Sequence, residues 1–129
     1  MIKVVTRERE GAEKAPTRSY SKKQESKVAK DIGGKRTLNS GATPWQPGDV
    51  TLDSLFLIEC KTKMTDSKSI TIHKDWLIKN LEESIFSGKE YNALAFNFGP
   101  DQKMYYIIDE NLFLELLDYL KEKHPNLLD

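Results

Sequence analysis

The segment that most constrains the fold is the apolar run Leu55–Ile58, which is followed at once by Glu59-Cys60-Lys61. Four large apolar residues in succession indicate a buried strand. Successive side chains of a strand point to opposite faces, so Glu59 and Lys61 share one face and Cys60 lies on the other. Two charged groups that enter a buried strand are costly unless they have partners. The fold must therefore supply such partners.

Asp49 precedes this strand by a short interval and supplies a second carboxylate. Mg²⁺ takes oxygen ligands and needs only one or two carboxylates from the protein. We expect Asp49 and Glu59 to hold Mg²⁺, with Mn²⁺ as a substitute and the backbone carbonyl of Cys60 as a third ligand. Lys61 would orient the attacking water or neutralise developing charge. The arrangement predicts metal-assisted phosphodiester hydrolysis, which needs a cation on the phosphate and an activated water.

A helix is predicted before this site, because Ser21-Lys22-Lys23-Gln24 fits a capping box with Ser21 as N-cap. The helix would run to about Ile32 and end at Gly33-Gly34. Glu25 would lie on or beside its inward face and complete the acidic cluster, directly or through a water. Since helices are rich in glutamate, Glu25 as an ordinary surface residue is the alternative.

The hydrophobic pattern predicts an α/β fold with a central mixed β-sheet flanked by helices, in the order αβββαβ. The elements expected after the first helix are strands at 35–37, 49–52 and 55–63, and the last two of these would pair as a hairpin. They are followed by a short strand at 70–72, a helix at 74–87 with Leu77, Leu81 and Ile85 on one face, strands at 92–98 and 103–108, and a last helix with the apolar stripe Leu112, Phe113, Leu116, Leu117 and Leu120. Residues 19–129 would form a single domain, and residues 1–18 a flexible basic N-terminal arm.

Charge is distributed unevenly along the chain. Lys and Arg balance Asp and Glu at 20 each, yet the first 36 residues hold eleven basic and five acidic residues. A basic N-terminal third predicts a polyanion-binding patch, and a solvated arm is the alternative. No apolar run approaches the roughly 20 residues of a membrane helix, and no signal-peptide core is present, so we expect a cytoplasmic protein without a membrane partner. Cys60, the only cysteine, is predicted to be a core thiol.

These residues resemble the PD-(D/E)XK nuclease superfamily. Asp49 matches the first acid, Glu59-Cys60-Lys61 the acid-x-lysine strand, and Glu25 the helical glutamate of many members. Within the superfamily the chain is most similar to archaeal-type and phage Holliday-junction resolvases, over about residues 20–98. The further matching pieces are Lys35-Arg36, Asn39-Ser40-Gly41-Ala42, Gly48-Asp49-Val50, Leu57 to Lys63 and Ser69 to Ile72.

The chain departs from the family pattern at two places. Gly48 stands where a proline often precedes the first acid, with Pro47 one position earlier. Relatives often carry a glutamine near the start of the helix after Ile72, whereas this chain has His73, Lys74 and Trp76 there. Which of these three side chains touches the site is left open by the sequence.

The resemblance implies a restriction-endonuclease-like core and a Mg²⁺-dependent DNA endonuclease. It implies a homodimer that nicks two opposed strands of a four-way junction, in DNA recombination and repair in a prokaryotic or phage-infected cell. The last helix and the strand at 103–108 are the candidate dimer surfaces. The expected DNA contacts are Arg36, Ser40, Lys63, Lys22, Lys23, His73 and Lys74. For Arg36 and Ser40, an ordinary structural role is equally compatible with the sequence.

Two other functions are compatible with the same residues. One is another nuclease of the superfamily, acting on flaps, single strands or duplex ends. The other is a nuclease-like fold that binds nucleic acid without cleaving it, or that serves as an interaction module. Substrate competition between a four-way junction and linear DNA separates the first alternative from a resolvase, and a cleavage assay in Mg²⁺ or Mn²⁺ tests the second.

Deletion of residues 1–18 is expected to weaken DNA binding, because the arm holds a concentration of positive charge that can reach phosphates beyond the active site. The metal-dependent chemistry should survive, since none of the candidate catalytic residues lies in the arm. Binding titrations of the full and shortened chains at two salt concentrations measure the effect. Equal affinity of the two chains would exclude a DNA-binding arm.

Overall fold

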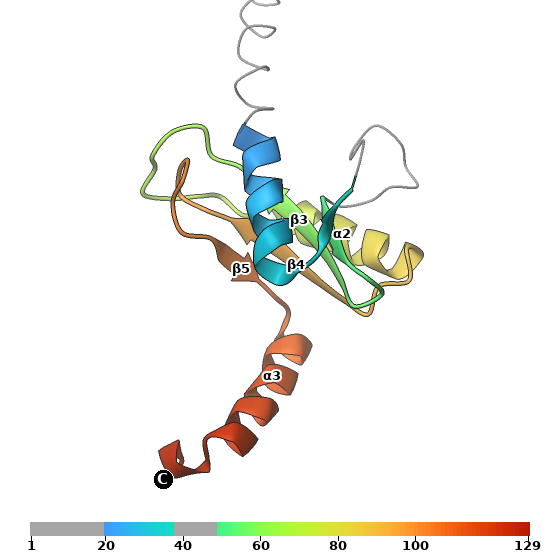
Figure 1. Ribbon diagram of the computed structural model, residues 1–129, viewed down its shortest axis with the longest axis vertical. Helices are drawn as coiled ribbons and strands as arrows, with labels where there is room; N and C mark the ends of the chain where they lie inside the picture. Colours follow the sequence, from blue (N-terminus) through green and yellow to red (C-terminus); the bar gives the residue numbers. More distant parts are fainter. Residues whose placement is uncertain (1–19, 38–48) are drawn as a thin grey trace, which may run out of the picture.

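The computed structural model describes residues 20–37 and 49–129 and shows an α/β fold around a five-stranded mixed sheet (Figure 1). Its first helix occupies residues 20–32. The other elements are, in chain order, β1 (Lys35–Arg36), β2 (Val50–Leu52), β3 (Phe56–Lys61), α2 (Lys74–Phe86), β4 (Tyr91–Phe96), β5 (Tyr105–Ile107), α3 (Glu110–Lys123) and a short 3₁₀ turn (Pro125–Leu127). The predicted arm of residues 1–18 lies outside the described residues.

The strands are arranged in chain order, β1-β2-β3-β4-β5, with β3 in the middle of the sheet. Strands β2 and β3 form the predicted antiparallel hairpin, in which Val50 pairs with Ile58. Strands β3 and β4 are parallel, and Ile58 pairs with Ala93. A parallel pair needs a crossover connection, and α2 supplies it. The predicted order of one helix, three strands, a helix, two strands and a last helix is confirmed.

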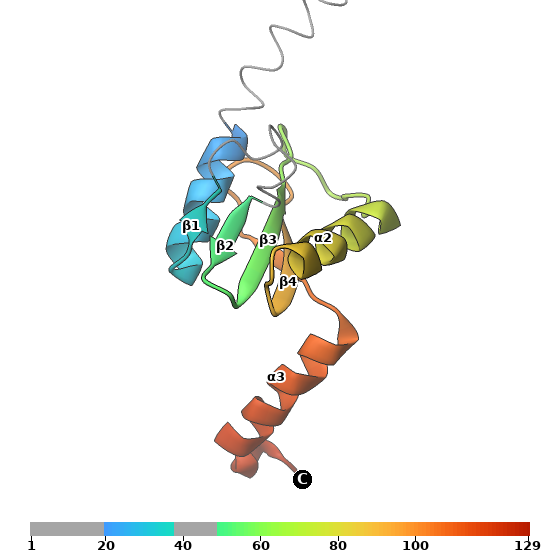
Figure 2. The same cartoon turned by 90° about the vertical axis from the view of Figure 1, so that its right-hand side faces the viewer.

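The sheet lies between two helices, the helix of residues 20–32 on one face and α2 on the other (Figure 2). On the first face Val28 packs with Val50, Ile58 and other small apolar residues of the strands. Leu57 alternates with Ile58 and is fully buried on the opposite face. Glu59 and Lys61 continue the alternation of Leu57, so they are directed to the face that α2 covers. The core therefore fixes which face of β3 carries the charged pair.

Two local predictions need correction. Ser21 is not an N-cap, because the helix already includes residue 20. The strand predicted at 70–72 does not form, and residues 62–73 are an irregular connection. Residues 70–72 are not among the strands of the sheet, whose order is β1-β2-β3-β4-β5. The predicted end of the first helix is confirmed, since Gly33 has a φ of 74°, a conformation that favours glycine.

Helix α2 faces the sheet with polar residues, contrary to its apolar pattern. The apolar residues expected on one face are partly exposed, with 37% for Leu77, 46% for Leu81 and 69% for Ile85. Asn80 and Ser84 are buried instead. The Asn80 side-chain N–H donates to the carbonyl of Ala93 at 2.9 Å, and the Ser84 hydroxyl donates to the carbonyl of Lys89 at 3.1 Å. These hydrogen bonds to backbone next to and within β4 orient the helix.

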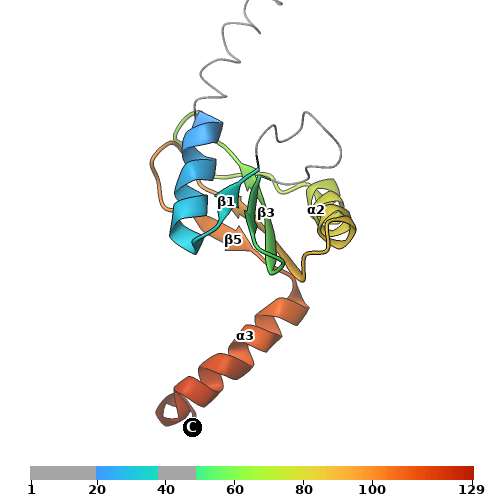
Figure 3. The same cartoon turned by 45° about the vertical axis from the view of Figure 1, so that its right-hand side comes forward.

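Helix α3 extends away from the sheet (Figures 1 and 3). Its N-cap is Asp109, whose side chain accepts a hydrogen bond from the backbone N–H of Leu112 at 2.8 Å. Leu112 is the only buried residue of this helix in the described structure. The predicted apolar stripe is therefore present, but most of it is not covered. In the described ranges, no helix is long and apolar enough to cross a membrane.

Leu57→Ala is expected to lower the free energy of unfolding by about 3 kcal/mol, because a fully buried leucine leaves a cavity at the centre of the sheet. Leu55→Ala is the matched control, since Leu55 is 45% exposed and should lose less than about 1 kcal/mol. Urea denaturation of both variants measures the difference. Equal losses at the two positions would contradict the assignment of Leu57 to the core.

Candidate functional site

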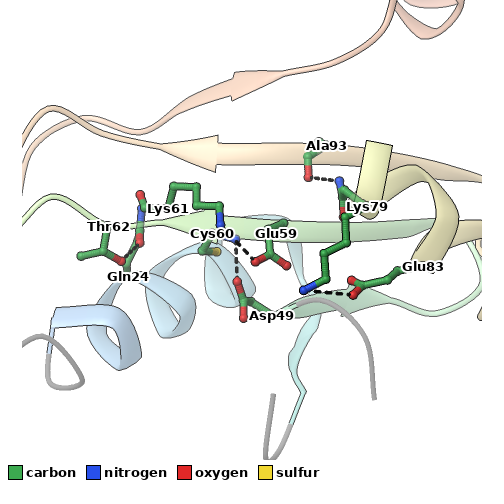
Figure 4. Close-up of polar contacts among 10 residues, drawn as sticks. Gln24, Asp49, Glu59, Cys60, Lys61, Thr62, Lys79, Glu83 and Ala93 are labelled. Atoms are coloured by element: carbon green, nitrogen blue, oxygen red, sulfur yellow. Dashed lines mark hydrogen bonds and ion pairs between the residues drawn. The ribbon is translucent and has the colours of Figure 1, made fainter. Parts of the chain in front are cut away.

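Asp49 lies directly before β2 and faces the end of β3 that carries Glu59-Cys60-Lys61 (Figure 4). The backbone N–H of Asp49 donates to the carbonyl of Ile58 at 3.1 Å, which extends the hairpin by one residue. The N–H of Cys60 donates to Asp49 Oδ2 at 2.7 Å. The Asp49 side chain is thus fixed beside Glu59, and its residue is only 9% exposed. Hairpin register brings together the two predicted carboxylates.

Lys61 lies between a carboxylate and an aromatic ring. Its Nζ is 3.8 Å from Glu59 Oε1, and both side chains are about three-quarters buried, with 28% and 25% exposed. The same Nζ lies 4.3 Å from the centroid of the Trp76 ring. A cation over an aromatic face is attracted by the ring quadrupole. Lys61 is therefore held in a defined position at the candidate site.

The carboxyl group of Glu59 is easier to protonate than an ordinary glutamate. Burial, which is the largest cause, and the negative charge of Asp49 together raise its pKa to about 7, although the Lys61 ammonium acts in the opposite direction. A buried carboxylate beside another carboxylate favours the neutral form unless a cation is near. The electrostatics of this pair therefore favour binding of a positive ion.

Glu25 comes from the helix that covers the other face of the sheet. Its Oε1 lies 3.4 Å from the Arg36 Nε, so the two predicted site residues form an ion pair with each other. Burial raises the pKa of Glu25, and the charge of Asp49 raises it further. Glu25 is thus electrostatically coupled to the site. Its role as a metal ligand, direct or through a water, stays a prediction.

The donor atoms at the site suit a hard cation with a partial water shell. The described part of the chain contains no group of three or more His, Cys, Asp or Glu side chains that could hold a metal ion. A closed zinc site needs four such protein ligands. Mg²⁺ keeps several waters and is bound through one or two carboxylates, and Asp49 and Glu59 provide two. The residues present therefore fit Mg²⁺ better than zinc.

Cys60 has the properties of a core thiol. It packs against the apolar cluster on the face opposite Glu59. Burial raises the pKa of its thiol, and the charge of Asp49 acts in the same direction. A protonated thiol is a poor nucleophile and a poor metal ligand. The prediction that Cys60 contributes through its backbone rather than its sulfur is consistent with this environment, and its carbonyl as a ligand stays a prediction.

Sequence reasoning missed Gln24, which ties the first helix to the end of β3. Its Nε2 donates to the carbonyl of Lys61 at 2.7 Å, and its Oε1 accepts from the hydroxyl of Thr62. Gln24 is 5% exposed. A signal was present, because Gln24 lies four residues before Val28 and therefore on the same inward side of the helix.

Helix α2 adds three further side chains near the site. The sequence left the role of Trp76 open and did not point to Lys79 or Glu83. Of His73, Lys74 and Trp76, it is Trp76 that contacts Lys61 of the site. Lys79 Nζ lies 3.8 Å from Glu83 Oε1, and both side chains act on the pKa of Glu59, Glu83 raising it and Lys79 lowering it (Figure 4). These two side chains lie near Glu59 because of the way α2 is rotated about its axis against the sheet.

Two of the expected DNA contacts are paired with acidic side chains in the described structure. Lys23 is paired with Asp101 at 2.5 Å, and Arg36 with Glu25. Lys63 lines a pocket of about 230 Å³ together with Lys23 and Gln24 of the first helix.

The remaining expected contacts differ in their surroundings. His73 meets the Trp76 ring edge to face, with the centroids 4.7 Å apart, so it approaches the site through that ring. Lys22 and Lys74 are exposed. Ser40 lies outside the described residues, as does the rest of the segment 38–48. Contact of any of these side chains with DNA stays a prediction.

Comparison of the chain with protein-family models, with curated proteins and with solved structures found no match in any of the three. The resemblance to PD-(D/E)XK nucleases therefore rests on the residues and their spacing. Family membership stays a prediction, and the function follows as a proposal.

Metal-free protein is expected to lose stability as the pH rises from about 5 to about 7.5, because the folded state holds a proton on Glu59 that the unfolded chain releases near its ordinary pKa. Since the folded pKa is the higher one, this contribution is complete at acidic pH and disappears as the pH passes about 7. Glu59→Gln should remove a pH-dependent loss on the order of 2 kcal/mol.

The measurement is urea denaturation in EDTA across this pH range. Glu82→Gln, at an exposed position of α2, is the control and should keep the wild-type slope. A Glu59→Gln slope equal to that of the wild type would show that the Glu59 carboxyl is not perturbed.

Proposed function

We propose that this protein is a Mg²⁺-dependent DNA endonuclease of the PD-(D/E)XK type. The observation that carries the proposal is the meeting of Asp49, Glu59 and Lys61 at one end of β3, where the Cys60 N–H holds the Asp49 carboxylate at 2.7 Å. Buried charged side chains of both signs that gather at one end of a strand are typical of a functional site. Phosphodiester hydrolysis uses this combination of two carboxylates and one ammonium group.

The surrounding elements support a restriction-endonuclease-like core. The hairpin of β2 and β3 carries the acids and the lysine, α2 crosses over, and β4 pairs parallel to β3. This succession agrees with the αβββαβ order that the hydrophobic pattern predicts. The support is one of topology, and the chemistry rests on the site residues.

Each side chain has a role that follows from its contacts. The chemistry that a bound Mg²⁺ supplies is Lewis-acid activation of the phosphodiester and of water. Asp49 and Glu59 would hold the ion, and the Cys60 N–H orients Asp49. Lys61 would stabilise negative charge that develops on the phosphate, and Trp76 holds its ammonium in place.

A four-way junction is the proposed substrate, and a homodimer the proposed active form. Both come from the resemblance to Holliday-junction resolvases. An enzyme that acts on branched DNA reads phosphate geometry rather than base edges. Two copies related by a two-fold axis suit two symmetric nicks. Recombination and repair are the processes that such an activity would serve.

Cleavage of a labelled four-way junction in Mg²⁺ is expected to give paired symmetric nicks, with none in EDTA. Asp49→Asn and Lys61→Ala should each reduce the rate by about 100-fold or more, because each removes charge at the reacting phosphate. Lys30→Ala, at an exposed lysine near the C-terminal end of the first helix, should cleave at the wild-type rate. Linear duplex and flap substrates in the same series define the specificity.

A binding measurement separates loss of metal from loss of chemistry. Mg²⁺ should raise the melting temperature of the wild type and of Lys61→Ala, but not that of Asp49→Asn.

Cleavage of all substrates alike would retain the nuclease and reject the resolvase. DNA binding without cleavage in Mg²⁺ or Mn²⁺ would favour the non-catalytic module.

A further inference from the structure

The apolar stripe of α3 has no cover among the described residues. Phe113 is 55% exposed, Leu116 44% and Leu120 52%, and Leu117, which is partly exposed, lies among them. We name these four residues the exposed stripe. They recur at intervals of three and four residues and so share one side of the helix. A contiguous apolar surface of this kind on a projecting helix indicates an interaction site.

The body of the protein holds only the first turns of α3. Leu112 is buried, and a hydrogen bond with Glu115 raises the pKa of Tyr91 at the start of β4 to about 12. Beyond these contacts the helix projects from the sheet (Figure 3). A helix of 14 residues is marginal in water unless its apolar side packs on something. The exposed stripe therefore needs an occupant.

The sequence of α3 is nearly symmetric about its midpoint, between Leu116 and Leu117. Phe113 and Leu120 are equally distant from that midpoint. When two copies lie antiparallel with their midpoints opposed, Phe113 of each copy meets Leu120 of the other. The leucines at the centre then meet each other. The apolar residues of one α3 therefore match those of a second α3 that runs in the opposite direction.

Charge selects the antiparallel orientation. The first turn of α3 is acidic, with Glu110, and the last turn is basic, with Lys121 and Lys123. Antiparallel pairing brings Glu110 of one copy near Lys121 of the other at both ends. Parallel pairing would bring like charges together, which is unfavourable. A second α3 meets both the apolar symmetry and the charge polarity of α3.

We propose that two copies of this chain associate through their α3 helices, antiparallel about a two-fold axis that passes between Leu116 and Leu117. The interface is isologous, because the same side of the same helix serves both copies. It lies outside the candidate active site, since α3 extends away from the sheet while Glu59 and Lys61 lie at the end of β3 (Figure 1). The proposal stands independently of the nuclease assignment.

Sedimentation equilibrium of the full chain tests the interface with two matched substitutions. Leu116→Asp places a charge in the exposed stripe and should weaken the dimer by at least about 100-fold. Leu114→Asp makes the same change at a residue that is 53% exposed and lies about 110° around the helix from the stripe. This control should dimerise like the wild type. Neither residue is buried, so the sheet should fold in both variants.

A charge exchange tests the orientation. Glu110→Lys and Lys121→Glu should each weaken the dimer about fivefold, since each converts two attractive pairs into repulsive ones. The double variant Glu110→Lys/Lys121→Glu restores unlike charges at both ends and should regain most of the wild-type affinity. Failure of the double variant to recover would overturn the antiparallel arrangement.

Three other outcomes would overturn the proposal as a whole. One is a wild type that stays monomeric up to about 100 µM. Another is a dimer that Leu116→Asp leaves intact, which would locate the interface elsewhere. The third is equal loss in Leu116→Asp and Leu114→Asp, which would indicate general apolar association rather than one helix side.

Discussion

The rest of the structure depends on the charged end of β3. This strand has neighbours on both edges and helices on both faces, yet it carries Glu59 and Lys61. Each nearby contact reduces the cost of that burial. The Cys60 N–H fixes Asp49, the Lys61 ammonium faces Glu59 and Trp76, and Gln24 satisfies the carbonyl of Lys61. Burial of Glu59 and, after it, repulsion by the Asp49 carboxylate still keep the pKa of Glu59 near 7, which favours binding of a cation.

The two helices that cover the sheet support this end of β3 in different ways. The helix of residues 20–32 uses a buried amide, Gln24, which both donates and accepts. Helix α2 is oriented by Asn80 and Ser84, whose hydrogen bonds satisfy backbone carbonyls at β4 and just before it. Because polar groups hold α2 to the sheet, its leucines are left partly exposed. Helix α3 also has few contacts with the sheet, so its exposed stripe is available to a second copy.

The candidate site could be predicted from the sequence where it depends on the geometry of one hairpin. Strand alternation places Glu59 and Lys61 on one face, and hairpin pairing brings Asp49 beside them. Contributions from helices were harder to predict. The i, i+4 spacing with Val28 indicates that Gln24 faces the sheet. The prediction named Glu25 instead, because its side chain is charged. Trp76, Lys79 and Glu83 depend on how α2 is rotated, which the sequence does not state.

The sequence by itself determined the order of the elements, the hairpin, the alternation of β3 and the position of each helix. These follow from local chain geometry, since periodicity and turn residues act over a few positions. Only the tertiary structure decided that α2 turns Asn80 and Ser84 inward, that residues 70–72 form no strand, and that α3 leaves its stripe exposed. The physical reason is that periodicity records which residues share a side of a helix. Which side is buried depends on the hydrogen-bonding groups and sheet edges that distant parts of the chain present.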